Sequence, residues 1–504
     1  MHYCGKFNYY NNALLKYGIM IPLRKIAISI VLMICQFSIN AQVVGFEAIV
    51  SDYGQLKMTL GENWDKVDSL AVKGPINYSD FNTIWECAFF GNLSILNLEN
   101  AQIEYNKIPD NALCDMNRQY WEVGGKTIYL GIKKIILPDN IVEIGRNAFN
   151  YMELEYINLP KSLRKLNQYS FANCHWLKVD PLIIPEGITE IPGQCFVNCQ
   201  SFRELILPST LRTICDLAFY NTRMEEVQFP CDLDSIGFAA FSESILLQKA
   251  ILPDNCHRLG GFVFNHCIRL NKLKIPNGIQ KVPNSFAGLC DSLEVVNFSG
   301  TVTEIGSSAF DGNYKLRNFK FPNNLEVIGH SAFYSCKPDS VVFPKSLKYL
   351  GGASCKNWNN VQKIYSMALV PPYCEEDNEN PGNYSFGGST PRDIPIYVPI
   401  GTAELYRNAQ GWNYFNNFIE IDRFPNTGVY GAKLQPKEDF VVYWADGTLY
   451  IELIKEMDDP IPFAVFSIDG RLIKNGYINE PNFALPIPKN IYVVQIGKLV
   501  YKVR

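Results

Sequence analysis

Short apolar segments that end in proline recur along the middle of the chain at intervals of 22 to 25 residues. Apolar and other residues alternate before each proline, which predicts a short β-strand. Proline ends that strand because it has no N–H to donate to a sheet. The positions that end the ten segments are Pro138, Pro160, Pro185, Pro208, Pro230, Pro253, Pro276, Ser299 in place of proline, Pro322 and Pro344.

The rest of each unit keeps the same phase. Aliphatic residues follow the proline by three and six positions, as at Ile141 and Ile144, and a phenylalanine follows, usually after alanine or serine. The nine phenylalanines are Phe149, Phe171, Phe196, Phe219, Phe241, Phe264, Phe286, Phe310 and Phe333. A unit of this length has no room for a strand, a full helix and two turns, so we predict one coil of strand, turn and short irregular or 3₁₀ segment.

A single coil cannot bury its apolar residues, whereas stacked coils place each one on its counterpart. The expected fold class is therefore mainly β: a leucine-rich-repeat type of solenoid with a parallel sheet along one side of the coil. We predict a lead-in and cap over residues 42–85, the solenoid over 86–365 and a closing segment over 366–424. Alternating strands around the turn dipeptides Asp446-Gly447 and Asp469-Gly470 predict a small antiparallel β-sandwich over 435–504.

The N-terminus has the pattern of an export signal. The basic pair Arg24 and Lys25 precedes an apolar run over 26–35, and Ala41 offers a small residue for cleavage. The run is too short to span a membrane as a mature helix. We predict a signal peptide over 1–41, with Met20 as an alternative start, and a secreted or cell-surface location.

Composition narrows the function classes. Hydrophobic residues make up 47% and charged residues 19%, as in a folded protein, and the net charge of −4 gives no electrostatic reason to expect a nucleic acid partner. Of 15 cysteines, thirteen remain after Cys4 and Cys35 are removed with the leader, which is an odd number. Several follow a repeat phenylalanine by three residues, as at Cys174 and Cys199, so we expect a stack of small buried side chains rather than a disulfide framework.

The repeat resembles the BspA-like leucine-rich repeat family over roughly residues 130 to 355. The resemblance implies surface display and adhesion or ligand binding, and it does not imply an enzyme. The C-terminal segment, with Gly470-Arg471 and the final strand pattern at 491–503, resembles the sorting domain of the type IX secretion system. Asn490 stands near the turn where that family usually has glycine, and the alternative is a plain β-sandwich that caps or spaces the solenoid.

No catalytic constellation, cofactor motif or standard metal site stands out. The pairs Cys256-His257 and His266-Cys267 match no zinc spacing, and the acidic segment 375–377 reads as a solvated loop rather than a calcium site. We therefore expect neither an enzyme nor a cofactor or metal.

The informative surface is the outward half of the strand ladder, where aliphatic residues are frequent early in the array and lysines later. An exposed aliphatic stripe is often a contact surface, although β-branched residues also suit strands for their own sake. The candidate ligand-binding residues are Ile136, Tyr156, Ile183, Ile206, Ile251, Lys272, Lys274 and Lys320. The expected partner is an extracellular protein from a host or neighbouring cell, with a polysaccharide as the alternative; the secretion machinery would engage the C-terminal domain, and the chain is expected to be monomeric.

Overall fold

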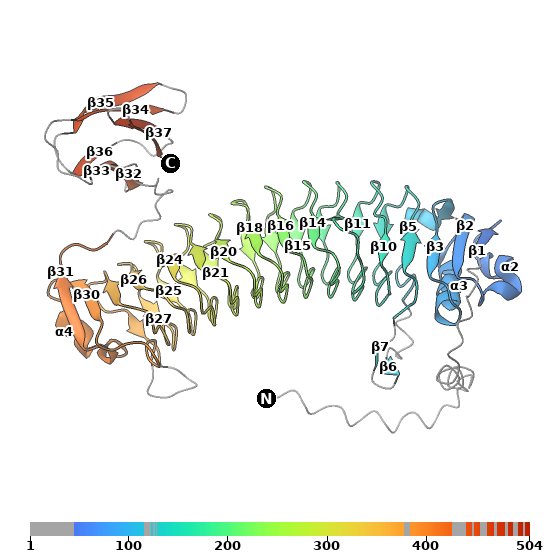
Figure 1. Cartoon of the computed structure of the whole chain (residues 1–504), viewed down its shortest axis with the longest axis horizontal. Coiled ribbons are helices and arrows are strands. Elements are labelled where there is room, and N and C mark those ends of the chain that lie inside the picture. The colour runs from blue at the N-terminus through green and yellow to red at the C-terminus, as the bar shows by residue number, and fades with distance from the viewer. Residues whose placement is uncertain are drawn as a thin grey trace. The chain divides into compact units, whose positions relative to one another are not determined.

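The computed structural model describes residues 45–114, 122–123, 126–127, 129–376, 384–425 and, between 440 and 503, seven strands and single residues beside them. The predicted signal peptide, Asp446-Gly447, Gly470 and Asn490 lie outside the described residues. The described residues between 45 and 425 form a solenoid in which the strands of successive coils lie side by side (Figure 1). The mainly β solenoid predicted from the sequence is confirmed.

The predicted strands before the prolines form a parallel ladder on one side of the coil, which we call the first ladder. It consists of three sheets separated by two gaps. Their strands are β1 (Gly45–Ile49), β2 (Ser69–Ile76), β3 (Ile95–Asn97), β8 (Lys134–Ile136) and β10 (Tyr156–Ile157); then β12 (Leu182–Ile183), β14 (Glu204–Ile206), β16 (Glu226–Gln228), β18 (Lys249–Ile251), β20 (Lys272–Lys274), β22 (Val295–Asn297) and β24 (Asn318–Lys320); then β26 (Ser340–Phe343), β28 (Lys363–Ser366), β30 (Pro395–Pro399) and β31 (Asn417–Ile421). β4 (Ala101–Ile103) pairs with the end of β2.

A second parallel ladder, which the sequence analysis did not predict, runs along another side of the same coils. In the ten coils that carry an anchor, its two-residue strands end at the aliphatic position six residues after the anchor, and the residue at this position is buried in every strand except the one that ends at Leu259. They are β5 (Lys107–Ile108), β9 (Glu143–Ile144) and β11 (Lys165–Leu166); then β13 (Glu190–Ile191), β15 (Thr213–Ile214), β17 (Ser235–Ile236) and β19 (Arg258–Leu259); then β21 (Lys281–Val282), β23 (Glu304–Ile305), β25 (Val327–Ile328), β27 (Tyr349–Leu350) and β29 (Tyr373–Cys374). Two residues are too few to show an alternating pattern in sequence, which is why this ladder was missed.

The two breaks in the second ladder coincide with prolines. Most coils carry glycine just after the strand, and its N–H donates to the preceding coil, as from Gly260 to the Ile236 carbonyl at 2.8 Å and from Gly306 to the Val282 carbonyl at 2.8 Å. Pro192 and Pro283 occupy this position at the β11/β13 and β19/β21 junctions, where the strands are not hydrogen-bonded. We call this hydrogen bond to the preceding coil a rung. Proline has no N–H, so the rung cannot form there.

The segment around each repeat phenylalanine is a turn and not the 3₁₀ helix that was one of our expectations. In most coils the second residue before and the second residue after the phenylalanine have left-handed φ, as at Asn147 and Tyr151, which flank Phe149. Their N–H groups and that of the phenylalanine donate to the next coil, at 3.1, 3.0 and 2.9 Å. Asparagine suits such positions because it tolerates this backbone, and its side-chain amide donates to the preceding coil, as from Asn198 Nδ2 to Asn173 Oδ1 at 2.7 Å.

The phenylalanines form a continuous buried stack, as predicted. Phe219 lies between Phe196 and Phe241, with ring centroids 5.4 Å away on both sides and nearly parallel planes. Phe264 packs on Phe241 but meets Phe286 edge-on at 82°. The prediction that Phe286 belongs to the same column needs correction. Phe241 donates its N–H to Val263, the residue before Phe264, whereas Phe264 donates its N–H to Phe286 itself, so Ala287 is the counterpart of Phe264. Phe286 therefore enters the core from one position earlier.

Buried polar side chains and aromatic rings complete the two ends. At the N-terminal end α2 (Leu56–Leu60) and α3 (Tyr78–Phe89) pack beside the first strands, and buried Asp80 accepts the N–H groups of Gly54, Leu56 and Asn77 at 2.7 to 3.0 Å. At the C-terminal end α4 (Ala403–Asn408) and the turn of Trp412 precede β31, and the Trp412 indole donates to the Pro372 carbonyl at 2.9 Å.

The C-terminal part forms two antiparallel sheets around a core of its own, which confirms the small sandwich. One sheet contains β32 (Phe440–Ala445), β33 (Thr448–Leu453) and β36 (Asn482–Pro486), and the other contains β34 (Ile461–Ser467), β35 (Leu472–Ile478), β37 (Tyr492–Ile496) and β38 (Leu499–Val503). Both contribute to one buried cluster, with Leu449 and Ile451 from the first sheet and Val465 and Val494 from the second.

Replacing Phe219 by alanine should destabilise the solenoid locally by about 3–5 kcal/mol, because a fully buried ring in close contact with two others would be lost. Since each coil contacts only its neighbours, the weakened coils should separate denaturant unfolding into two transitions. Phe238→Ala is the matched control, because the Phe238 ring is 46% exposed and its loss should change the unfolding curve little. A single unchanged transition for Phe219→Ala would contradict the stacked core.

Candidate functional site

The candidate surface is the outward face of the seven-stranded sheet that runs from β12 to β24. Strand register places Ile183 opposite Ile206, Ile206 opposite Gln228, and Gln228 opposite Ile251. The three isoleucines are 54%, 40% and 59% exposed, so they form an aliphatic column interrupted by one glutamine. β-Branched side chains with half of their surface in water contribute little to the core, which makes this column available for contact.

Charged side chains divide the neighbouring column of the same sheet into two blocks. Glu204 stands opposite Glu226, and Lys249 stands opposite Lys272, so like charges face each other within each block. A single ion pair, between Lys249 Nζ and Glu226 Oε2 at 3.8 Å, joins the blocks. Like charges placed opposite each other destabilise a sheet slightly. A partner that placed opposite charges over each block would offset this repulsion.

The structure brings six of the eight predicted residues into this one sheet. Lys274 and Lys320 continue the isoleucine column, with Asn297 between them in register, and Lys272 lies in the charged column. The Lys274 ammonium contacts both Asp254 carboxylate oxygens at 2.8 and 2.9 Å. All three lysines are exposed.

Ile136 and Tyr156 lie in the preceding sheet and are separated from the others by the unpaired β10/β12 junction. Ile136 is only partly exposed. The Tyr156 ring is 45% exposed and lies under the Lys134 ammonium, 5.6 Å from the ring centroid. These two residues therefore form a separate part of the outward face. The gap falls in the 25-residue unit that ends at Pro185, the longest of the series, where Pro181 directly precedes β12 and has no N–H to donate to a strand ladder.

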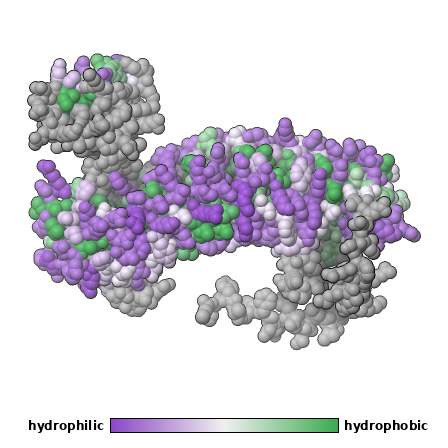
Figure 2. Space-filling model, in the orientation of Figure 1, coloured by the Kyte–Doolittle hydropathy of each residue, from purple (hydrophilic) through white to green (hydrophobic). Residues whose placement is uncertain are grey.

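The outward face continues through β28 and β30 toward the C-terminal end of the solenoid. Tyr365 pairs in register with Tyr397, and their rings stack at 4.6 Å. Ile419 follows Tyr397 in the same column and is 36% exposed. The alternating pattern of residues 395–399 could have revealed Tyr397 as an outward residue. Figure 2 shows hydrophobic patches separated by hydrophilic side chains on the side of the solenoid that it displays.

The histidine and cysteine pairs do not converge on a metal site. Cys256 is buried, whereas the neighbouring His257 points outward to Asp234, with 3.2 Å between His257 Nδ1 and the carboxylate. His266 Nδ1 likewise lies 2.6 Å from Glu243, while Cys267 faces the core. In the described residues no group of three or more His, Cys, Asp or Glu side chains could hold a metal ion. Asp377 of the acidic loop lies outside the described residues.

Eleven of the thirteen described cysteines are buried, as predicted for the repeat positions. Five of these thiols, those of Cys174, Cys199, Cys267, Cys290 and Cys336, donate to the phenylalanine carbonyl of the preceding coil, as from Cys174 to Phe149 at 3.0 Å and from Cys290 to Phe264 at 3.1 Å. Trp358 takes the same position at the end of the stack and donates to the Phe333 carbonyl at 2.8 Å. Burial raises the pKa of Cys174 and Cys290 to about 12, which makes these thiols structural and chemically inert.

A family model described as the BspA type leucine rich repeat region, with six copies, matches residues 128–248 and 235–362. No curated protein is significantly similar to the chain. In the described residues no helix is both long and apolar enough to cross a membrane.

Several solved structures are similar to this chain. A leucine-rich repeat protein from Bacteroides ovatus is 21% identical over 66% of this chain and 88% of its own, with a TM-score of 0.47. A leucine rich cell surface protein from Faecalibacterium prausnitzii is 18% identical over 70% of this chain and 83% of its own, with a TM-score of 0.36. The pneumococcal vaccine antigen PcpA is 16% identical over 58% of this chain and 80% of its own, with a TM-score of 0.36.

The buried thiols should resist alkylation in the native protein. A thiol with a pKa of about 12 is ionised in roughly one molecule in ten thousand at pH 8, so Cys174, Cys195 and Cys290 should react with iodoacetamide only after denaturation. Exposed Cys231 should react within minutes, and Cys231→Ser should remove this fast phase. Mass spectrometry of peptides labelled at pH 8 measures each site, and rapid native labelling of Cys174 would contradict the buried thiol column.

Proposed function

Because residues 128–362 of the chain belong to the BspA-type leucine-rich repeat family, we propose that the protein is a non-enzymatic extracellular binding protein. Its first ladder contacts a protein partner through the outward face of β12 to β24. The isoleucine column beside the two charge blocks is the single observation that carries the proposal. Apolar residues supply contact area, and charges supply orientation and selectivity.

A partner must span several coils, because each strand presents no more than two outward side chains. Ile183 and Ile251 are separated by two intervening strands of the sheet, and the lysines lie beyond them along the same face. An elongated protein surface with an apolar centre, an acidic region over Lys272 and Lys274 and a basic region over Glu204 and Glu226 has the complementary chemistry. Binding free energy is expected to concentrate at the aliphatic column.

A second candidate is a polysaccharide, and one observation favours it. The stacked Tyr365 and Tyr397 side chains are partly exposed on the outward face of the closing segment, and Lys363 Nζ lies 5.9 Å from the Tyr365 ring. Tyrosine offers both an apolar ring and a hydroxyl, which suits the mixed surface of a sugar. A glycan would then bind near the C-terminal end of the solenoid and leave the isoleucine column free.

The export and sorting parts of the proposal rest on the sequence. Residues 1–41 would direct export and be removed, and residues 435–504 would engage the secretion machinery or serve as a spacer. Monomeric chains would display the solenoid at the cell surface or in the medium.

Replacing Ile183, Ile206 and Ile251 by serine should increase the dissociation rate of the protein partner. Replacing Lys272, Lys274 and Lys320 by glutamate should mainly lower the association rate and the salt sensitivity of binding. Surface plasmon resonance against a panel of extracellular-matrix proteins measures both rates, and a glycan array run beside it tests the second candidate.

The serine variants should leave the fold intact, because half-exposed positions usually change stability by only a few tenths of a kcal/mol. Lys274→Glu also places a second carboxylate beside Asp254, so its folding must be checked separately. Leu289→Ser, an exposed leucine outside the first ladder, is the apolar control. If folded variants of both sets bind like the parent, the first ladder is a scaffold and the partner lies elsewhere.

Processing provides a separate check of the export proposal. The exported protein should begin near Gln42, because the apolar run and Ala41 together form the cleavage region. N-terminal sequencing of protein recovered from the cell surface or medium measures this. A mature chain that still contains residues 26–35 would be incompatible with a cleaved signal peptide.

A further inference from the structure

The junction between β19 and β21 holds a cavity of about 690 Å³ on the second ladder, away from the proposed protein-binding face. Its volume falls in the range of small-molecule binding sites. It lies where β19 and β21 are not paired, and Pro283 stands at this junction without an N–H to donate to the β19 coil. Gly261 and Gly278 also line it, and both pack closely: a Cβ at Gly278 would lie 2.8 Å from the His257 ring, and one at Gly261 would lie 3.1 Å from the Asn284 carbonyl oxygen.

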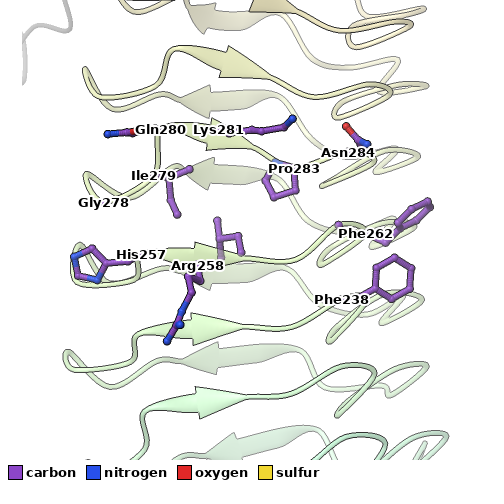
Figure 3. A pocket seen from close by; sticks show the side chains of 12 residues that line it. Phe238, His257, Arg258, Phe262, Gly278, Ile279, Gln280, Lys281, Pro283 and Asn284 are labelled. Carbon is purple, nitrogen blue, oxygen red and sulfur yellow. The ribbon is translucent and has the colours of Figure 1, made fainter.

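The floor of the cavity is apolar and reaches the core. Leu259 is partly exposed, whereas its equivalents Ile236 and Val282 in the adjacent coils are 1% and 0% exposed. Among the described strands of the second ladder, Leu259 is the single member of this aliphatic column that is not buried. Ile279 and Pro283 also line the cavity (Figure 3). The solenoid therefore leaves part of its core uncovered at this junction.

The two ends of the cavity differ in chemistry. Phe238 and Phe262 lie together at one end, 46% and 37% exposed, with ring centroids 5.3 Å apart (Figure 3). Arg258 and Lys281 are exposed cations in the lining, and His257 lies at the end away from the phenylalanines. The lining contains no carboxylate.

The neighbouring carboxylates neutralise the basic lining only in part. Asp234 is shared between Arg258 and His257, and Lys281 Nζ lies 2.6 Å from Glu304 Oε1. These pairs are largely exposed, so each contributes little, and a ligand anion can compete for the same donors. In Figure 3 the Arg258 side chain extends away from Lys281 and Pro283, in keeping with its pairing with Asp234 of the preceding coil, so the guanidinium has to turn toward the cavity before its N–H groups can bind a ligand carboxylate.

We propose that this cavity binds a small amphipathic carboxylate, a molecule with an apolar or aromatic body and one anionic end. The body covers Leu259 and contacts Phe262, and the carboxylate accepts hydrogen bonds from Arg258 or Lys281. The rings of Phe238 and Phe262 are tilted by 54°, so they form a corner for an apolar group rather than a flat platform for a sugar. The proposal for this cavity is independent of the partner proposed for the first ladder.

The probe is 2-naphthoate, titrated into the full chain by isothermal calorimetry with 2-naphthalenemethanol as the uncharged analogue. The parent should bind 2-naphthoate saturably with a Kd of about 0.1–1 mM, as expected for a small ligand in an open cavity. The alcohol should bind at least about fivefold more weakly, and Arg258→Gln should remove most of this difference.

Pro283→Gly is the decisive variant, because glycine stands at this position in several coils and restores the N–H. The rung should form, the cavity should close, and 2-naphthoate binding should weaken at least about tenfold. Pro192→Gly is the matched control: it repairs the other proline junction and should leave binding unchanged. Should Pro283→Gly fail to fold, Phe262→Ala replaces an exposed ring and should weaken binding at least about fivefold.

Three outcomes would overturn the proposal. The first is no saturable binding by the parent up to 5 mM, and the second is equal binding by the parent, Pro283→Gly and Phe262→Ala. The third is Pro283-dependent binding of an acetylated Asp-Phe peptide amide without binding of 2-naphthoate, which would assign the cavity to a peptide.

Discussion

Hydrogen bonding between the backbones of adjacent coils is the constraint on which the structure depends. Most coils donate to their neighbours in the first ladder, in the second ladder and around the repeat phenylalanine. These donors must stay in register, so the unit length varies little, and side chains one coil apart are forced to stack. The columns of phenylalanine, cysteine and asparagine follow from this spacing, because like shapes pack on like shapes at a fixed separation.

The same constraint explains which residues the turns accept. Left-handed backbone at two positions in most coils is strained for most side chains, and it occurs here even at Leu217 and Phe262. Hydrogen bonds from these residues to the next coil hold the conformation. Glycine after the second strand has a different cause: a Cβ at Gly351 would lie 2.3 Å from the backbone nitrogen of His330 in the preceding coil. Close approach of the coils, and not flexibility, selects glycine there.

The core is filled by the inward-facing columns of side chains, so stacking places no requirement on the outward residues. Differences among the outward residues therefore give information about function. The aliphatic column, the two charge blocks and the stacked tyrosines occupy outward positions whose composition the stack does not dictate. Interruptions are informative for the same reason. At the junction that contains Pro283 the strands are not paired, Leu259 is partly exposed and a cavity opens, while the solenoid continues on both sides.

The sequence by itself determined the solenoid, the first ladder, the buried phenylalanines and the thiol column, because each is set by residue type at a fixed period. Ile183, Ile206 and Ile251 could be placed outward for the same reason. It did not determine the second ladder, since two residues carry no alternating signal, nor the place of Phe286, since a shift of one residue leaves the motif intact. The separation of Tyr156 from the main sheet, the pairing of Tyr365 with Tyr397 and the cavity at Pro283 depend on which strands pair across coils. Contacts between residues distant in sequence decide that pairing, so only the tertiary structure could show them.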